Sequence, residues 1–146
     1  MAVEVRAARA EDEAGCMALL QALIGRPESD AWRSVFRRLL DGARGAVLVA
    51  HEAGALLGVA TVSYNLAIRY GGEYCQLEEL IVSAEARGKN AGGLLVQAAV
   101  RAARERGCAE MGLYLLPSTE GNRPFYAKYG FAHVGSELRQ ELPSGR

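Results

Sequence analysis

The fold is decided by one stretch of the chain, Leu80-Ile81-Val82-Ser83-Ala84-Glu85-Ala86-Arg87-Gly88-Lys89-Asn90-Ala91-Gly92-Gly93-Leu94-Leu95. Its apolar start predicts a strand that ends at Val82, and the periodic apolar residues from Leu94 onward predict a helix over about 91–106. The turn between them brings glycines and cations to the start of that helix, where backbone N–H groups have no intrahelical acceptor. The helix dipole adds positive potential there. The stretch therefore predicts a cradle for a pyrophosphate, with an ordinary strand–helix connection as the alternative.

Outward from this stretch, predicted strands and helices alternate. Residues 3–8 predict a first strand, helices follow over 11–24 and after the N-cap Ser29, and a hairpin covers 46–51 and 56–66. Strands are predicted over 74–82 and 111–116, and a short helix is predicted over 124–129. Residues 131–134 and 136–142 predict a closing pair of strands. We expect a single α/β domain over residues 1–146, with a mixed central sheet of about six to seven strands and about four helices.

Composition excludes several classes of protein. The 146 residues carry 17 Lys+Arg and 17 Asp+Glu, and this zero net charge argues against nucleic-acid binding by phosphate neutralisation. No apolar run is long enough to span a membrane, and the acid-rich start is not a secretory signal. The three widely spaced cysteines predict neither a disulfide framework nor a metal site. A cytoplasmic location is therefore expected.

The turn itself is neither a G-x-x-x-x-G-K-[ST] loop nor a G-x-G-x-x-G turn. Arg87-Gly88-Lys89-x-x-Gly92, after a strand that ends in Val, resembles the acetyl-CoA motif of the GNAT superfamily of N-acetyltransferases, R/Q-x-x-G-x-G/A. Asn90 stands where the family usually has its first glycine. Asparagine is the residue next most tolerant of positive φ, so the departure is physically mild.

A second segment carries the same resemblance. Phe125-Tyr126-Ala127-Lys128-Tyr129-Gly130-Phe131 is similar to the family's signature F/L-Y-x-x-x-G-F, in the family's order and at about its spacing. The expected order of elements also resembles the family over nearly the whole chain. The resemblance implies a sheet that is splayed between its fourth and fifth strands.

The resemblance also implies acetyl-CoA as co-substrate and no metal. The pantetheine arm of acetyl-CoA would pair with strand backbone between the splayed strands, and the turn would hold the pyrophosphate. Asn122 is a further candidate, because the family often has an asparagine seven residues before the tyrosine, where this chain has Thr119. The implied cofactor-binding residues are Leu80, Ile81, Val82, Arg87, Gly88, Lys89, Asn90, Ala91, Gly92, Gly93 and Asn122.

Three groups are candidates for the chemistry. The acceptor amine must lose a proton, and Glu78 and Glu79 are adjacent carboxylates whose side chains should point to opposite faces of a strand. Glu78, nine residues before the motif arginine, matches an acid of some family members and is favoured. The main-chain N–H of Val82 would stabilise the oxyanion, and Tyr126 would protonate the leaving thiolate. The structural alternative for the glutamates is an ion pair with an arginine. The structural alternative for Tyr126 is aromatic packing.

The resemblance implies direct transfer of acetyl from acetyl-CoA to a primary amine of a small molecule in a ternary complex. The two carboxylates favour a small cationic amine as the acceptor. A non-catalytic acyl-CoA-binding module, an acetyltransferase of protein N-termini or lysines, and an interaction protein that binds no coenzyme A stay open as alternatives. No nucleic acid or membrane partner is expected, and a homodimer is open because family members often dimerise.

Overall fold

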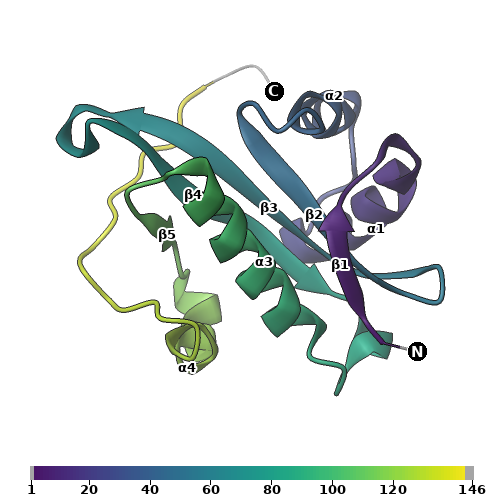
Figure 1. Ribbon diagram of the computed structural model, residues 1–146. Coiled ribbons are helices and arrows are strands. Elements are labelled where there is room, and N and C mark those ends of the chain that lie inside the picture. Colours follow the sequence, from purple (N-terminus) through teal and green to yellow (C-terminus); the bar gives the residue numbers. More distant parts are fainter. Residues whose placement is uncertain (1, 144–146) are drawn as a thin grey trace. The chain divides into compact units, whose positions relative to one another are not determined.

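The computed structural model describes residues 2–143, shown in Figure 1. These residues form two compact units that divide between Leu113 and Tyr114. The prediction of one domain over 1–146 stays a prediction. Within the described residues, no helix is long and apolar enough to cross a membrane.

The first unit is built on one sheet of five strands in the order β1-β2-β3-β4-β5. The first three pairings are antiparallel, and β4 and β5 run parallel, so the predicted mixed sheet is confirmed. The predicted count of six to seven strands is too high. The strands are β1 (Glu4–Ala7), β2 (Gly45–Glu52), β3 (Ala55–Ala67), β4 (Gly72–Val82) and β5 (Met111–Leu113).

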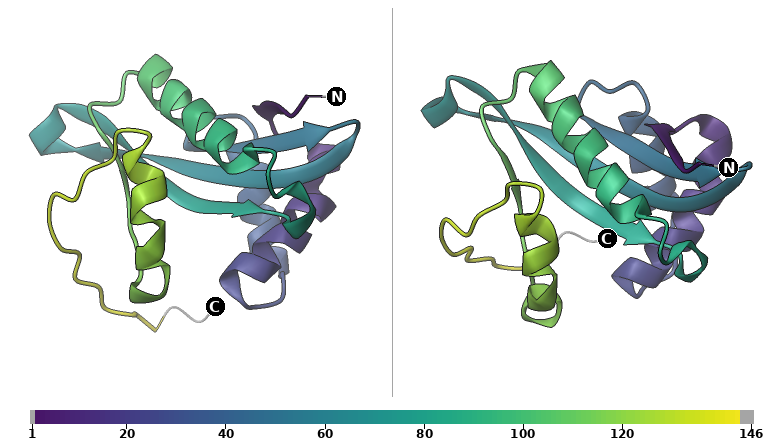
Figure 2. Two further views of the ribbon diagram at one scale, coloured as in Figure 1. Left: turned by 90° about the horizontal axis from the view of Figure 1, so that it is seen from below. Right: turned by 60° about the horizontal axis from the view of Figure 1, so that its bottom comes forward.

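Helices cover both faces of this sheet. Figure 2 shows α3 (Ala91–Arg106) on one face and α1 (Glu13–Ile24) and α2 (Asp30–Leu39) on the other. The predicted N-cap of α2 is confirmed, since the Ser29 hydroxyl accepts a hydrogen bond from the Trp32 amide at 3.2 Å. Gly107 ends α3 in the left-handed conformation, with φ 87°, as its position after the apolar periodicity indicates.

The two faces have separate buried layers. On the α1 and α2 face, Val47, Val49 and Val59 of the sheet pack with the helix residues Cys16, Met17, Leu20 and Phe36. On the other side, α3 buries Leu95, Val96, Ala99 and Ala103. Each fully buried large aliphatic side chain contributes roughly 1.5–3 kcal/mol of transfer free energy, so these layers fix the central strands that carry the site.

The second unit holds a 3-10 helix over Pro117–Asn122 and the short helix α4 (Arg123–Ala127). Gly130 follows with φ 92°, which only glycine adopts readily. The closing strands predicted over 131–134 and 136–142 are wrong: these residues have no regular secondary structure. The alternating pattern alone does not make a strand, because a strand also needs a partner edge, and Val134 and Leu138 are almost fully exposed.

Candidate active site

The turn after β4 has the backbone that a close approach to an anion requires. A 3-10 turn over Ala84–Ala86 anchors it through the buried Ala86. Gly88 follows with φ 79° and Asn90 with φ 57°, both left-handed. Asn90 is thus placed in the conformation that the family's glycine would adopt without strain.

The start of α3 offers unpaired amides. The Asn90 carbonyl accepts the first helical bond, from the Leu94 amide at 3.1 Å. The amides of Ala91, Gly92 and Gly93 precede that bond and have no intrahelical acceptor. Together with the helix dipole, they make this end of α3 able to hold a phosphate group.

Two cations project from the same turn. Arg87 is exposed and forms no ion pair within residues 2–143. Lys89 Nζ donates to Glu52 Oε1 at 2.7 Å, across to the end of β2. The turn therefore carries one cation without a partner in the described chain and one that is held by a carboxylate.

The edge of β4 beside this turn is open. The pairing of β5 with β4 covers only Cys75–Leu77, so Glu78–Val82 has no strand partner on that side among the described residues. The predicted splay between the fourth and fifth strands is confirmed. Leu80, Ile81 and Val82, the residues expected to pair with an extended ligand, lie on this open segment.

The Val82 amide is directed towards the open edge. The next amide, of Ser83, donates to the Leu57 carbonyl of β3 at 2.8 Å. Successive amides of an extended strand point to opposite edges, so the Val82 N–H points away from β3. Gly58 keeps β3 close at this level, because a β-carbon there would lie 2.9 Å from the Ile81 carbonyl oxygen.

One polar group at the start of the turn could not be singled out from the sequence. The Ser83 hydroxyl oxygen is buried and has no hydrogen-bond partner within residues 2–143. Such an orphaned buried hydroxyl is uncommon, and it lies directly after Val82. Its only sequence signal is its position, directly after the predicted end of the strand at Val82.

The two glutamates of β4 do not point to opposite faces, which corrects the sequence prediction. Thr61 pairs with Glu79 and Val62 with Leu77, so Glu78 is the extra residue of a β-bulge. The Thr61 hydroxyl donates to Glu79, and the Ser63 hydroxyl donates to Glu78 Oε2 at 2.6 Å. Because Thr61 and Ser63 are two residues apart on β3, both carboxylates lie on one face.

That face is the one covered by α1 and α2. Val59, which alternates with Thr61, packs in the core layer beneath those helices. Burial raises the pKa of Glu79, the Thr61 hydrogen bond lowers it, and the nearby charge of Glu78 raises it further, with a net upward shift. No lysine or arginine in the described part of the chain pairs with either glutamate, so the predicted alternative of an arginine ion pair does not hold there.

Within the second unit, Tyr126 belongs to an aromatic cluster. Its ring packs edge-to-face on Phe125 at 5.0 Å and on Phe131 at 6.1 Å between centroids. Burial raises the pKa of the Tyr126 phenol, so the group keeps its proton at neutral pH. The predicted packing role is present, and a half-buried, protonated hydroxyl is also what a proton donor requires.

Thr119 and Asn122, in the same unit, differ in their contacts. Thr119 closes the 3-10 turn: its hydroxyl accepts from the Leu116 amide at 2.9 Å and donates to the Leu116 carbonyl at 3.2 Å. Asn122 is exposed at the start of α4 and makes no capping hydrogen bond. Thr119 therefore has a structural role, whereas the Asn122 amide is available to a ligand.

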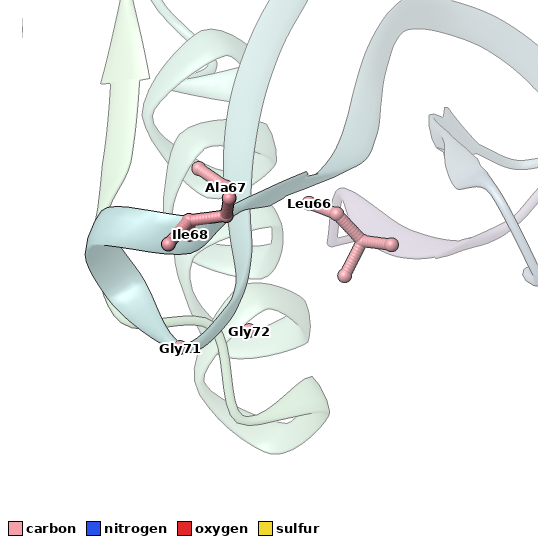
Figure 3. A pocket seen from close by; sticks show the side chains of 5 residues that line it. All are labelled: Leu66, Ala67, Ile68, Gly71 and Gly72. Carbon is pink, nitrogen blue, oxygen red and sulfur yellow. The ribbon is translucent and has the colours of Figure 1, made fainter.

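An apolar depression lies elsewhere, at the tip of the β3–β4 hairpin. Figure 3 shows its lining, which consists of Leu66, Ala67, Ile68, Gly71 and Gly72. None of the predicted site residues contributes to it. The candidate active site is therefore defined by the open edge of β4 and its turn, not by this depression.

Comparison with known proteins agrees with this geometry. The family model described as Acetyltransferase (GNAT) family matches residues 11–131. The chain belongs to this family. It is therefore an enzyme of the acetyltransferase class, and its family uses acetyl-CoA as the acyl donor.

GNAT relatives are similar over most of the chain. Glucosamine 6-phosphate N-acetyltransferase 1 of Oryza sativa subsp. japonica is 35% identical over 131 residues, which cover 85% of this chain and 77% of the relative. The glucosamine-6-phosphate N-acetyltransferase of Arabidopsis thaliana has a TM-score of 0.81 at 19% identity, covering 97% and 99% of the two chains. Aminoglycoside N-acetyltransferase AAC(6')-Iy in complex with CoA has a TM-score of 0.84 at 18% identity, with 97% and 95% covered. The two structural matches support the GNAT fold.

Proposed function

We propose that the chain transfers an acetyl group from acetyl-CoA to a primary amine of a small molecule, by direct attack in a ternary complex. One observation carries the proposal. The open edge of β4, with the Val82 amide directed outward, runs straight into a turn whose left-handed residues and free amides suit a pyrophosphate.

The residues that would hold acetyl-CoA follow from this geometry. The backbone of Leu80, Ile81 and Val82 would bind the pantetheine arm as an added strand. Residues Gly88 to Gly93 would bind the pyrophosphate through the amides that the turn leaves free; the Lys89 amide is not among them, because it donates to the Ala86 carbonyl at 3.1 Å. The Arg87 and Lys89 side chains would add charge. Asn122 is a further candidate through the resemblance to the family. In this arrangement, acetyl-CoA supplies an activated thioester carbonyl.

The chain's own groups would then serve the transfer. The Val82 N–H would donate to the carbonyl oxygen as negative charge develops on it. The carboxylates of β4 would take the proton of the acceptor ammonium, because only the neutral amine attacks. As the C–N bond forms and the C–S bond breaks, the Tyr126 hydroxyl would protonate the departing thiolate.

The acceptor class is proposed from the site and the relatives together. Two carboxylates without a cationic partner among the described residues favour a positively charged amine. Relatives named for acetylation of glucosamine 6-phosphate make an amino sugar phosphate the first member of the panel to test. A diamine, an aminoglycoside and an amino acid complete the panel of small amines, and a peptide N-terminus represents protein substrates.

The test has two parts. Calorimetry with acetyl-CoA should show saturable binding, and thiol release should depend on one of the small amines. Binding without amine-dependent thiol release would favour the acyl-CoA-binding module instead. Absence of binding would favour the interaction protein, and activity on the peptide alone would favour a protein acetyltransferase.

A further inference from the structure

The β-bulge in β4 gives the two glutamates different surroundings on the same face. Glu78, the bulged residue, is exposed, and its carboxylate is held by the Ser63 hydroxyl at 2.6 Å. The Asn65 amide donates to that hydroxyl in turn, at 3.0 Å. Glu79 is half-buried, and its carboxylate accepts from the buried Thr61 hydroxyl.

These surroundings suit two different tasks. An exposed carboxylate that accepts a hydrogen bond stays hydrated and can attract a cation. A carboxylate in a less hydrated position beside a like charge binds a proton more readily. Among the described residues, no lysine or arginine pairs with either carboxylate, so an incoming ammonium would meet two negative charges here.

We propose that Glu79 is the group that accepts the proton of the acceptor ammonium. Glu78 binds this ammonium and, as a neighbouring negative charge, favours proton binding by Glu79. The bulge is what allows this division, since a regular strand would send the two side chains to opposite faces. The inference rests on the proposed function and deepens it. It also reverses the preference for Glu78 that the resemblance to the family suggests.

The proton balance is simple. An N–H bond of the ammonium breaks, its proton moves to a Glu79 carboxylate oxygen, and the electron pair stays on the nitrogen. The neutral amine then attacks the thioester carbonyl carbon. As the C–N bond forms, the C–S bond breaks with its electron pair on sulfur, and the thiolate takes the proton of its donor, Tyr126. The second proton of the nitrogen goes to solvent, Tyr126 regains a proton from solvent, and Glu79 returns its proton to water before the next turnover.

Among the described residues, Glu78 is the charged group whose proximity raises the pKa of Glu79. On α1, the helix that packs against β4, the Cys16 thiol is neutral because burial raises its pKa to about 12, and Glu13 pairs with Arg37 at 2.7 Å. From β3, the partner is the uncharged Thr61 hydroxyl. The pKa of Glu79 should therefore respond to changes at Glu78 and Thr61.

The test compares Glu79→Gln, Glu78→Gln and Thr61→Val through the pH profile of kcat/KM for the best small amine. Glu79→Gln should lower kcat/KM by about 100-fold or more and remove the acidic limb of the profile. Glu78→Gln should raise KM for the amine and move the acidic limb to lower pH, because a negative neighbour is gone. Thr61→Val should move the limb to higher pH, because a stabilising hydrogen bond is gone.

Thermal unfolding and acetyl-CoA calorimetry on each variant establish that fold and donor binding are intact. If Glu79→Gln does not fold, the opposite shifts of the other two variants still decide the matter. An acidic limb that survives in Glu79→Gln but disappears in Glu78→Gln would overturn the inference and leave the proposed function standing. A wild-type enzyme that binds acetyl-CoA but releases no thiol with any amine would overturn both.

Discussion

Lys89 Nζ lies 2.7 Å from Glu52 Oε1, so a cation of the proposed pyrophosphate-binding turn is held by a carboxylate at the end of β2. Glu52 flanks the tight turn that joins β2 to β3, where Ala53 and Gly54 have φ of 51° and 82°. This pair ties two loops that are far apart in sequence. A phosphate that enters the turn has to compete with Glu52 for the Lys89 ammonium.

The variant Glu52→Gln tests this competition. Removing the carboxylate frees Lys89 and takes away a negative charge beside the phosphates. The affinity for acetyl-CoA should rise by about twofold to fivefold at low salt, and the gain should shrink as salt is added. Calorimetry at two salt concentrations measures the change. A fall in affinity would mean that Glu52 positions Lys89 for the phosphate instead of competing with it.

Asn90 should tolerate glycine and reject alanine. Its φ of 57° costs a residue with a β-carbon about 1 kcal/mol, a cost that glycine avoids and asparagine bears better than alanine. Asn90→Gly should bind acetyl-CoA at least as tightly as wild type, and Asn90→Ala about fivefold more weakly. Equal affinities in the two variants would show that the turn does not need its left-handed backbone for binding.

Replacing Tyr126 by phenylalanine should separate binding from chemistry. The phenol keeps its proton because burial raises its pKa, and only the hydroxyl is lost in Tyr126→Phe. We expect kcat to fall by about 100-fold while acetyl-CoA affinity stays near wild type. Tyr129→Phe, in the same aromatic cluster, is the matched control and should keep its activity. Unchanged turnover in Tyr126→Phe would remove this residue from the mechanism.

The elements predicted best are those whose signals are local. The helix over 91–106 has the predicted bounds, because periodic apolar residues mark its face and Gly107 ends it in the one conformation that glycine favours. The left-handed Asn90 could be foreseen for the same reason, since asparagine at a glycine position signals positive φ.

The features that depend on a partner could not be predicted. The bulge at Glu78 exists only in the pairing of β4 with β3, so the alternation rule gave the wrong faces for the two glutamates. The prediction of closing strands was wrong for a similar reason. The alternating pattern of residues 131–142 forms a strand only where the edge of a sheet is available for pairing. The sequence also does not predict that the Ser83 hydroxyl is buried without a hydrogen-bond partner among the described residues.

Acid should weaken the link between β1 and the start of α1. Asp12 accepts hydrogen bonds from the Arg6 guanidinium at 2.7 and 3.1 Å, which lower the pKa of its carboxyl, and it also accepts from the Arg9 amide at 2.7 Å. A lowered folded pKa means that this stability is present above about pH 4 and is lost as pH falls through the folded pKa.

Asp12→Asn should therefore lower the free energy of unfolding by about 1 kcal/mol at pH 7. The difference from wild type should shrink as the wild-type carboxyl is protonated below about pH 4. Urea unfolding at pH 7, 5 and 3 measures both quantities. A difference that stays constant over this range would show that the charge of Asp12 is not what stabilises the link.

The central claim is that the turn after β4 binds the pyrophosphate of acetyl-CoA through its backbone amides. Backbone amide NMR during titration with coenzyme A tests it most directly, with pantetheine, which lacks the pyrophosphate, as the matched control. We predict that the amide signals from Gly88 to Gly93 shift saturably with coenzyme A but not with pantetheine. The amide signals around Val82 should shift with both ligands. Amides from Gly88 to Gly93 that stay in place at saturating coenzyme A would contradict the account.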